Sequence, residues 1–186
     1  LVSVVSKTTT TIEVRNSAPA ESDPRAPPII ESREAIRGFT WTRGGRILYA
    51  RGARLLERAA DGGERVVLES EANSPLANPA ICAGTGQVIF DWSYRNGSSS
   101  RDLWRLDPDG GEPAQLTDVP MAQSPVCSPD GQWVIFISPN GVHRVRTSGG
   151  AVESLDSTVV YSTTAWSPDS KAIAWVAGIR TPTALL

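Results

Sequence analysis

The stretch Ser128-Pro129-Asp130-Gly131-Gln132-Trp133-Val134-Ile135-Phe136-Ile137 contains a tight turn followed by an unbroken apolar run. Pro, Asp and Gly are turn residues because they pre-set φ, accept backbone hydrogen bonds and tolerate positive φ, respectively. A strand with one face in water alternates apolar and polar residues, and this run does not alternate. The stretch therefore predicts a turn and a β-strand covered on both faces.

The same pattern of a turn and an apolar run recurs along the chain. The runs end in aromatic residues spaced by 41, 46 and 39 positions, namely Tyr49, Phe90, Phe136 and Trp175. Gly-Gly pairs at 62–63, 110–111 and 149–150 are each followed by four residues and then a leucine, which gives a second, independent marker. A period of about 40 residues indicates a repeat protein built from one supersecondary unit.

Each unit reads as four short strands that are joined by Gly, Pro and Asn-Gly turns. Asn96-Gly97 and Asn140-Gly141 predict type I′ hairpins, in which both central residues have positive φ. Four-stranded sheets that stack on one another form a β-propeller. We predict an all-β chain, a partial β-propeller with about three complete blades. The expected divisions are 1–35 (partial blade and Pro-rich loop), 38–70, 77–118, 122–157 and 159–186 (partial blade).

The two ends are predicted to be incomplete blades. Residues 2–5 and 11–15 read as strands of an earlier blade, and the last unit contains only its first two strands and a short remainder. We expect an open arc cut from a larger ring, and the remaining blades of that ring would be its partner. A closed four-bladed ring, in which the end segments share one blade, is the alternative.

Composition and charge exclude several classes of protein. The formal net charge is −2 and the sequence pI is about 5.5, so we expect no nucleic-acid partner. No apolar run approaches the roughly 18 residues of a spanning helix, so we expect no membrane insertion by this segment. No signal peptide is visible, and both ends read as cuts through a longer protein.

The sequence offers little catalytic chemistry. His143 is the only histidine and shares a repeat position with Trp104 and Leu56, which predicts a packing role. No Gly-x-Ser-x-Gly elbow, phosphate loop or His-Glu-x-x-His motif is present. We therefore expect no catalytic residues, no metal and no cofactor, and we interpret the segment as non-enzymatic.

The two cysteines are predicted to be free thiols. Cys82 and Cys127 are aligned in the same repeat position, at the end of the first strand of neighbouring units. Stacked sheets lie about 10 Å apart, whereas a disulfide needs Cα atoms within about 7 Å. Both side chains are therefore expected to pack in the core.

One stretch is locally basic. Seven arginines between 33 and 58 face only two glutamates over the same span. The simplest interpretation is a solvated blade face, and the sharper one is a patch for an acidic partner. Loop tips, notably 93–101, are the other expected binding elements. The candidates for partner binding are Arg43, Arg46, Arg51, Tyr94 and Arg95.

Two motifs carry a family resemblance. The Ser128–Gly131 turn with its following strand, and the stretch from Leu103 to Thr117, resemble the TolB-like, WD-repeat-like units of bacterial β-propellers over about 38–176. The turns at 43–45 and 84–86 lack Pro-Asp, and Ser170 stands where glycine is expected, so these turns should be less regular. The order of variants resembles the C-terminal propellers of membrane-anchored bacterial serine/threonine kinases.

The resemblance implies a function without fixing it, because one fold hosts many functions. We expect a non-catalytic module for protein interaction or ligand sensing. The expected parent is a bacterial signalling protein with the propeller outside the cytoplasm. The alternatives are the gating propeller of a prolyl-oligopeptidase-type serine peptidase and a TolB-like periplasmic interaction protein. The protein or small-ligand partner is not identified by these residues.

Overall fold

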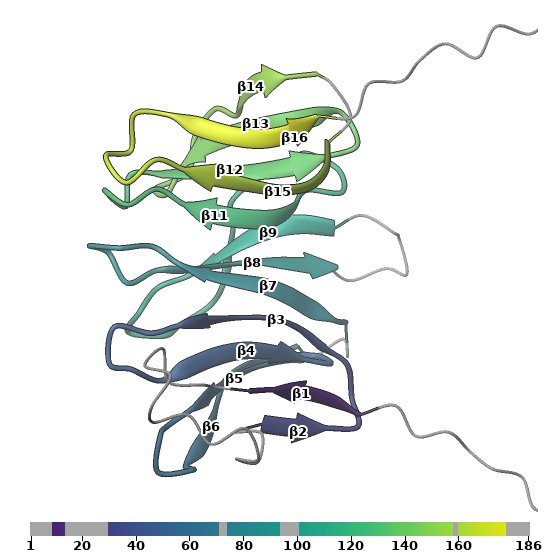
Figure 1. Cartoon of the computed structure of the whole chain (residues 1–186), viewed down its shortest axis with the longest axis vertical. Helices are drawn as coiled ribbons and strands as arrows, with labels where there is room; N and C mark the ends of the chain where they lie inside the picture. Colours follow the sequence, from purple (N-terminus) through teal and green to yellow (C-terminus); the bar gives the residue numbers. More distant parts are fainter. Residues whose placement is uncertain (1–8, 14–29, 71–73, 94–100, 158–159, 178–186) are drawn as a thin grey trace, which may run out of the picture.

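The fold consists entirely of antiparallel β-sheets. The computed structural model describes residues 9–13, 30–70, 74–93, 101–157 and 160–177, which form sixteen strands and no helix within these ranges. Figure 1 shows the sheets stacked in chain order, from β1 (Thr10–Ile12) and β2 (Ile30–Ser32) at the bottom to β15 (Val160–Trp166) and β16 (Ile173–Ala177) near the top. The predicted all-β class is confirmed.

Three of the sheets are complete four-stranded meanders, in which each strand pairs with the next along the chain. Blade 1 contains β3 (Ile36–Trp41), β4 (Ile47–Arg51), β5 (Arg54–Arg58) and β6 (Glu64–Glu69). Blade 2 contains β7 (Leu76–Ile81), β8 (Val88–Ser93), β9 (Arg101–Leu106) and β10 (Ala114–Gln115). Blade 3 contains β11 (Gln123–Cys127), β12 (Trp133–Ser138), β13 (Gly141–Arg146) and β14 (Glu153–Asp156).

The core lies between the blades, because the second strand of each blade is apolar on both faces. Phe90 on β8 is fully buried against Leu48 and Leu55 of blade 1. Phe136 on β12 is fully buried against Ile89 and Leu103 of blade 2. Side chains of one strand alternate between the two interfaces. This is the two-sided cover that the unbroken apolar run predicts.

The turn between the first and second strands uses a hydroxyl group in three of the four units. Ser128 Oγ donates to Asp130 Oδ1 and accepts from the Trp133 amide. The hydrogen bonds to Asp130 hold the pKa of its carboxyl below the usual value. Ser167 repeats the arrangement with Asp169, and Thr42 Oγ1 accepts from the Arg46 amide. The corresponding residue in blade 2 is Cys82, whose amide donates to the Gln87 carbonyl.

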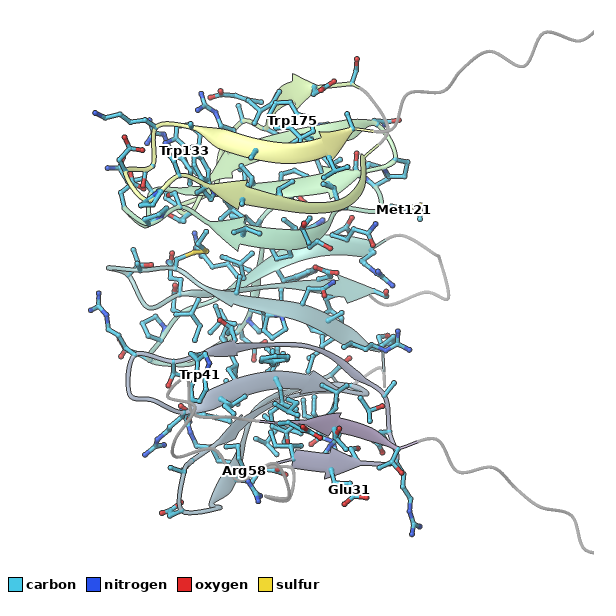
Figure 2. The ribbon with its side chains drawn as sticks, in the orientation of Figure 1. Glu31, Trp41, Arg58, Met121, Trp133 and Trp175 are labelled. Atoms are coloured by element: carbon cyan, nitrogen blue, oxygen red, sulfur yellow. A yellow bond between two sulfur atoms is a disulfide. The ribbon has the colours of Figure 1, made fainter. Side chains whose placement is uncertain are left out.

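The prediction of free thiols is wrong, because Cys82 and Cys127 form a disulfide with Cα atoms 5.1 Å apart (Figure 2). The hydrogen bond from the Cys82 amide to Gln87 matches the one from the Ser128 amide to Trp133, so Cys82 lies one position beyond the equivalent of Cys127. Successive side chains of a strand face opposite sides. The two thiols therefore face each other, and the first strands of blades 2 and 3 lie closer than sheets that stack in parallel.

The predicted type I′ turn at Asn140-Gly141 is also wrong. Ser138 pairs with Gly141, so the central residues of the turn are Pro139 and Asn140, and Asn140 is not among the residues with positive φ. Gly141 begins β13 with φ 120°, and a Cβ there would lie 1.9 Å from the Asp156 carbonyl oxygen. The glycine is required by this close approach of β14. The Asn96-Gly97 turn lies outside the described residues.

Large apolar side chains are exposed on β3 of blade 1 and on β16. Phe39 and Trp41 on β3 are 55% and 52% exposed, and Val176 on β16 is 59% exposed. The counterparts of Trp41 in the next two blades are Ile81, which packs against the core of blade 1, and Cys127, which is bonded to blade 2. In blades 2 and 3, the residue equivalent to Trp41 therefore contacts the preceding blade.

Candidate functional site

The candidate site is a cleft of about 530 Å³ between blades 1 and 2, at the end where the first and second strands turn. Its floor is made of aliphatic side chains from both blades, namely Leu48, Val67, Ile81, Val88 and Leu106. Ligand pockets span about 300–1,000 Å³ and combine an apolar lining with a few polar groups. The volume and the floor of this cleft fit that description.

One wall of the cleft carries an excess of positive charge. Arg43, Arg46 and Arg65 line it together with Glu57, whose side chain is only 9% exposed. Arg65 Nε donates to Glu57 Oε2, and Arg46 Nη1 lies 3.6 Å from the same oxygen. One buried carboxylate thus faces two guanidinium groups, and Arg43 adds a third. Within the described part of the chain, Arg43 has no ion pair.

The opposite wall is the turn of blade 2 that contains Asp107, Pro108 and Asp109. Asp107 Oδ1 accepts from Gln87 Nε2 at 2.8 Å and lies 3.8 Å from Arg105 Nε. Asp109 is exposed and lies at the rim. The cleft is therefore dipolar, with a basic wall, an acidic wall and an aliphatic floor.

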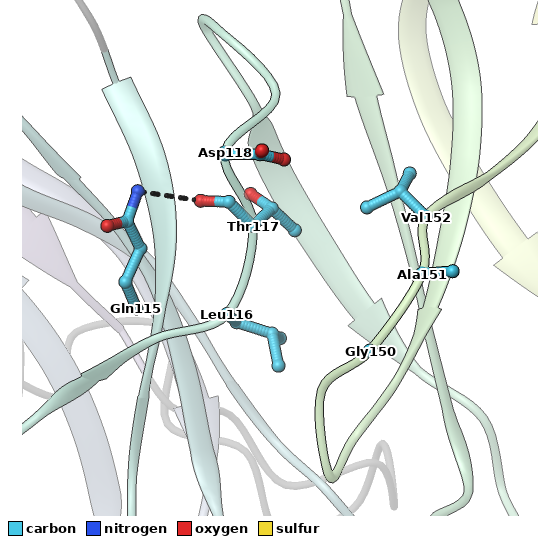
Figure 3. Close-up of a pocket in the computed structure, with 7 residues that line it drawn as sticks. All are labelled: Gln115, Leu116, Thr117, Asp118, Gly150, Ala151 and Val152. Carbon is cyan, nitrogen blue, oxygen red and sulfur yellow. Dashed lines mark hydrogen bonds between the residues drawn. The ribbon is translucent and has the colours of Figure 1, made fainter.

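A second hollow lies between the outer parts of blades 2 and 3 (Figure 3). It is lined on one side by Gln115–Asp118 and on the other by the small residues Gly150, Ala151 and Val152. Gln115 Nε2 donates to the Thr117 carbonyl at 2.9 Å, so this side chain is engaged within its own segment. Asp118 is the single charged residue of the lining, and nothing in the hollow is arranged to fix a ligand.

The turn end of the interface between blades 2 and 3 is closed. The disulfide joins β11 to the turn after β7. A Cβ at Gly131 would lie 1.8 Å from the Ala83 carbonyl oxygen, so the two turns are in direct contact there. Arg105 Nη1 reaches across to the Thr147 carbonyl at 3.2 Å. In blade 1 the residue equivalent to Arg105 is Glu57. Its side chain bonds to Arg65 of the same blade instead of to the neighbouring blade, and the cleft stays open.

Only part of the predicted basic patch lies at this cleft. Arg43 and Arg46 line it, whereas Arg51 Nη2 donates to Glu64 Oε1 at 3.2 Å on another surface. Tyr94 and Arg95 lie outside the described residues. Arg54 pairs with Glu69, and Arg58 pairs with Glu64. Both glutamates belong to β6 and therefore lie outside the span 33–58, over which the basic stretch was defined.

Glu64 also organises a small network beside Arg51. Tyr49 Oη donates to Glu64 Oε2, and burial together with this hydrogen bond raises the pKa of Tyr49 to about 12. Tyr49 is fully buried and packs with Ile12 and Ile30 of the N-terminal sheet. Arg51 therefore contributes to packing at the edge of blade 1 and does not line the cleft.

His143 occupies a packing position. It pairs across the hairpin with Phe136, and the two rings stack at 5.3 Å between centroids. Its Nε2 lies 2.9 Å from Ser138 Oγ. Burial lowers the pKa of His143 from its usual value. No other titratable group accompanies it in a catalytic arrangement within the described ranges.

Asp91 is a buried charged residue that the sequence analysis missed. It is fully buried on β8, where its Oδ2 accepts from Asn78 Nδ2 at 2.7 Å and its Oδ1 accepts from the Ser124 amide at 3.1 Å. Burial raises the pKa of Asp91 to about 7, although its hydrogen-bond partners and Arg101 oppose the change. The carboxyl links the first strands of blades 2 and 3. The only sequence signal is a polar residue in an otherwise apolar run.

The described residues contain no group of three His, Cys, Asp or Glu side chains that could hold a metal ion. They also contain no helix that is long and apolar enough to span a membrane. The cleft offers a ligand apolar contact on its floor and charged groups on its walls.

Comparison with known proteins supports the fold assignment. No family model matches the chain. Over 100 residues, the chain is 33% identical to uncharacterized protein YidR of Escherichia coli (strain K12). These residues make up 50% of this chain and 23% of that protein. The structure of TolB from Acinetobacter baumannii matches with a TM-score of 0.68 and 19% identity, over 85% of this chain and 41% of TolB.

An oligogalacturonate lyase from Vibrio parahaemolyticus matches with a TM-score of 0.64 and 14% identity, over 84% of this chain and 50% of that chain. These solved structures and the observed sheets establish the fold as that of TolB-like β-propellers. The chain spans half or less of the length of each of these proteins. The similar structures include proteins named as enzymes, such as this lyase and a virginiamycin B lyase.

Proposed function

We propose that this chain is a non-catalytic recognition segment of a larger β-propeller that acts outside the bacterial cytoplasm. The observation that carries the recognition role is the open cleft between blades 1 and 2, because the corresponding end of the next interface is closed by a covalent bond and a close backbone contact. An open cleft with charged walls and an apolar floor is suited to a docked partner.

The exposed apolar side chains support the larger ring. Phe39 and Trp41 occupy a face that preceding strands cover in the other blades, and Val176 is exposed on β16. Exposed apolar clusters of this kind mark interaction surfaces. The remaining blades of the parent propeller are the partner that these faces fit.

The disulfide supports the location outside the cytoplasm. Disulfides persist in oxidising compartments and are rare where thiols are kept reduced. Blocking free thiols in intact cells with membrane-permeant N-ethylmaleimide, then denaturing and reducing the protein and adding a maleimide of high mass, tests this point. The disulfide-bonded chain should gain the mass of two labels after reduction, and the absence of this shift would contradict the proposed compartment.

The parent protein has more than one candidate. A TolB-like interaction protein is favoured by the match to TolB over 85% of this chain. A signalling kinase and a gating propeller of a prolyl-oligopeptidase-type peptidase are the other two proposals, and each predicts a different flanking domain. The sequence of the complete gene discriminates between the three.

Site-specific photocrosslinking in the full-length protein tests the recognition role. A benzophenone amino acid at Gly44 would lie in the cleft, and the same residue at exposed Lys171 would lie outside it. The proposal expects a discrete crosslinked species in living cells from position 44 and none from position 171. Equal, diffuse labelling from both positions, or turnover of a substrate by the isolated propeller, would contradict it.

A further inference from the structure

The cleft between blades 1 and 2 has chemistry that selects among ligands, and the following inference rests on the recognition role proposed above. We propose that it binds an extended acidic peptide segment of a partner protein, with an aliphatic side chain on the floor and a carboxylate against Arg43 and Arg46. The floor, the basic wall and the acidic wall each restrict the class of ligand that the cleft can bind.

The floor argues for an aliphatic group. Its five side chains come from Leu, Val and Ile residues of both blades, and none of the sixteen residues that line the cleft is aromatic. Sugars and nucleobases are generally held by stacking on aromatic side chains, as single-stranded nucleic acids are. A leucine or valine side chain of a peptide gains more from this floor, because the burial of apolar surface against aliphatic side chains is favourable.

The basic wall argues for a carboxylate. Among the described residues, the Arg46 side chain is engaged only by a 3.6 Å contact to Glu57, and it is 50% exposed. Glu57 already accepts the shorter hydrogen bond from Arg65. Guanidinium groups bind carboxylates through paired hydrogen bonds. Arg43 and Arg46 thus retain donors that an incoming acidic residue can satisfy.

The acidic wall discriminates against strongly acidic polymers. Asp107 and Asp109 lie across the floor from the arginines, and Asp109 has no ion pair within the described ranges. A chain with a carboxylate on every unit would meet these aspartates with like charge, which is destabilising. A peptide with one or two acidic residues beside an aliphatic residue satisfies one wall without opposing the other.

A labelled peptide tests the assignment directly. The probe is a fluorescein-labelled acetylated peptide of sequence Gly-Asp-Leu-Gly-Ser amide, titrated with the full-length protein and followed by anisotropy. Two matched peptides replace Asp by Asn or Leu by Gly. We expect saturable binding of the first peptide and at least about tenfold weaker binding of each of the others, since tenfold corresponds to about 1.4 kcal/mol.

Variants locate the binding within the cleft. Arg43→Glu and Arg46→Glu should each weaken binding by about tenfold or more, because close charge pairs at interfaces couple strongly. Arg33→Glu makes the same change of charge at an exposed position outside the cleft and should leave the affinity unchanged. Gly44→Trp should fill the cleft and abolish binding, and Gly44 has no positive φ that would strain the larger residue.

Hydrogen exchange of the full-length protein with and without the peptide maps the contact. Protection over 42–46 and 106–110 supports the proposal. Protection only over 115–118 and 150–152, or absence of saturable binding, overturns it. Tighter binding of oligogalacturonate or single-stranded DNA to the cleft also overturns the peptide assignment. These outcomes leave the recognition role standing, because that role is tested separately by crosslinking in cells.

Discussion

The interfaces on the two sides of blade 2 are built from the same repeat but differ at their turn ends. Toward blade 3, a disulfide, the Gly131 contact with Ala83 and the Arg105 hydrogen bond to Thr147 close the interface. Toward blade 1, the equivalent region is a cleft of about 530 Å³. Both interfaces keep a buried cluster of apolar side chains. The difference indicates that packing in the centre holds the blades together and that the turn ends can vary independently.

The largest expected effect comes from emptying the two apolar centres. Phe90→Ala and Phe136→Ala should each reduce the free energy of unfolding by about 3–5 kcal/mol, because each leaves a cavity where a fully buried ring had packed. Urea denaturation of each variant, with the disulfide kept oxidised, measures this loss. A much smaller loss for Phe90→Ala would show that the open interface is also loose at its centre.

The next effect concerns the covalent bond. Replacing both cysteines by serine (Cys82→Ser with Cys127→Ser) should reduce the free energy of unfolding by about 2–4 kcal/mol, because the bond closes a long loop of the unfolded chain. Thermal unfolding with and without reductant measures the change. Reduced wild type and the double variant should coincide, and an unchanged midpoint on reduction would contradict the bond.

Asp91 should make the closed interface sensitive to pH. Its pKa is about 7 in the folded protein and about 4 when unfolded, so the folded state binds its proton more tightly. The stabilisation from this proton is fully present below about pH 4 and is lost as the pH rises to about 7. The free energy of unfolding should therefore fall by a few kcal/mol across this window through Asp91 alone.

The measurement compares wild type with Asp91→Asn between pH 4 and pH 8, which cancels the titration of the other carboxyl groups. An asparagine can still accept from the Ser124 amide and can donate to Asn78 if that amide turns over. The variant should gain stability relative to wild type as the pH rises. A difference that does not change with pH would show that Asp91 stays ionised.

The smallest expected effect is at the open cleft. Arg46→Ala should change the free energy of unfolding by less than about 0.5 kcal/mol, because its contact with Glu57 is long and half-exposed ion pairs contribute little. The same urea series measures it. A loss above about 1 kcal/mol would mean that the basic wall is required for folding and is not free to bind a partner.

Most of the fold could be predicted from sequence because its determinants are local. Turn chemistry at Ser128–Gly131 and the apolar run that follows define one hairpin, and the repeat multiplies it. The site could be predicted only in part. Arg43 and Arg46 were identified from local charge, but the walls they face come from blade 2, and the pairing of Arg51 with Glu64 depends on how β4, β5 and β6 align.

Local sequence patterns specify the repeating unit, its four strands and the two-sided burial of each second strand, because turn residues and apolar periodicity act over a few positions. The face that each side chain occupies between blades depends on tertiary packing. A shift of one residue moves a side chain to the opposite face of the sheet, as at Cys82. The backbone hydrogen bonds that decide which face a side chain occupies form together with the neighbouring blade. For the same reason, the disulfide, the buried Asp91 and the cleft emerged only when the blades were packed together.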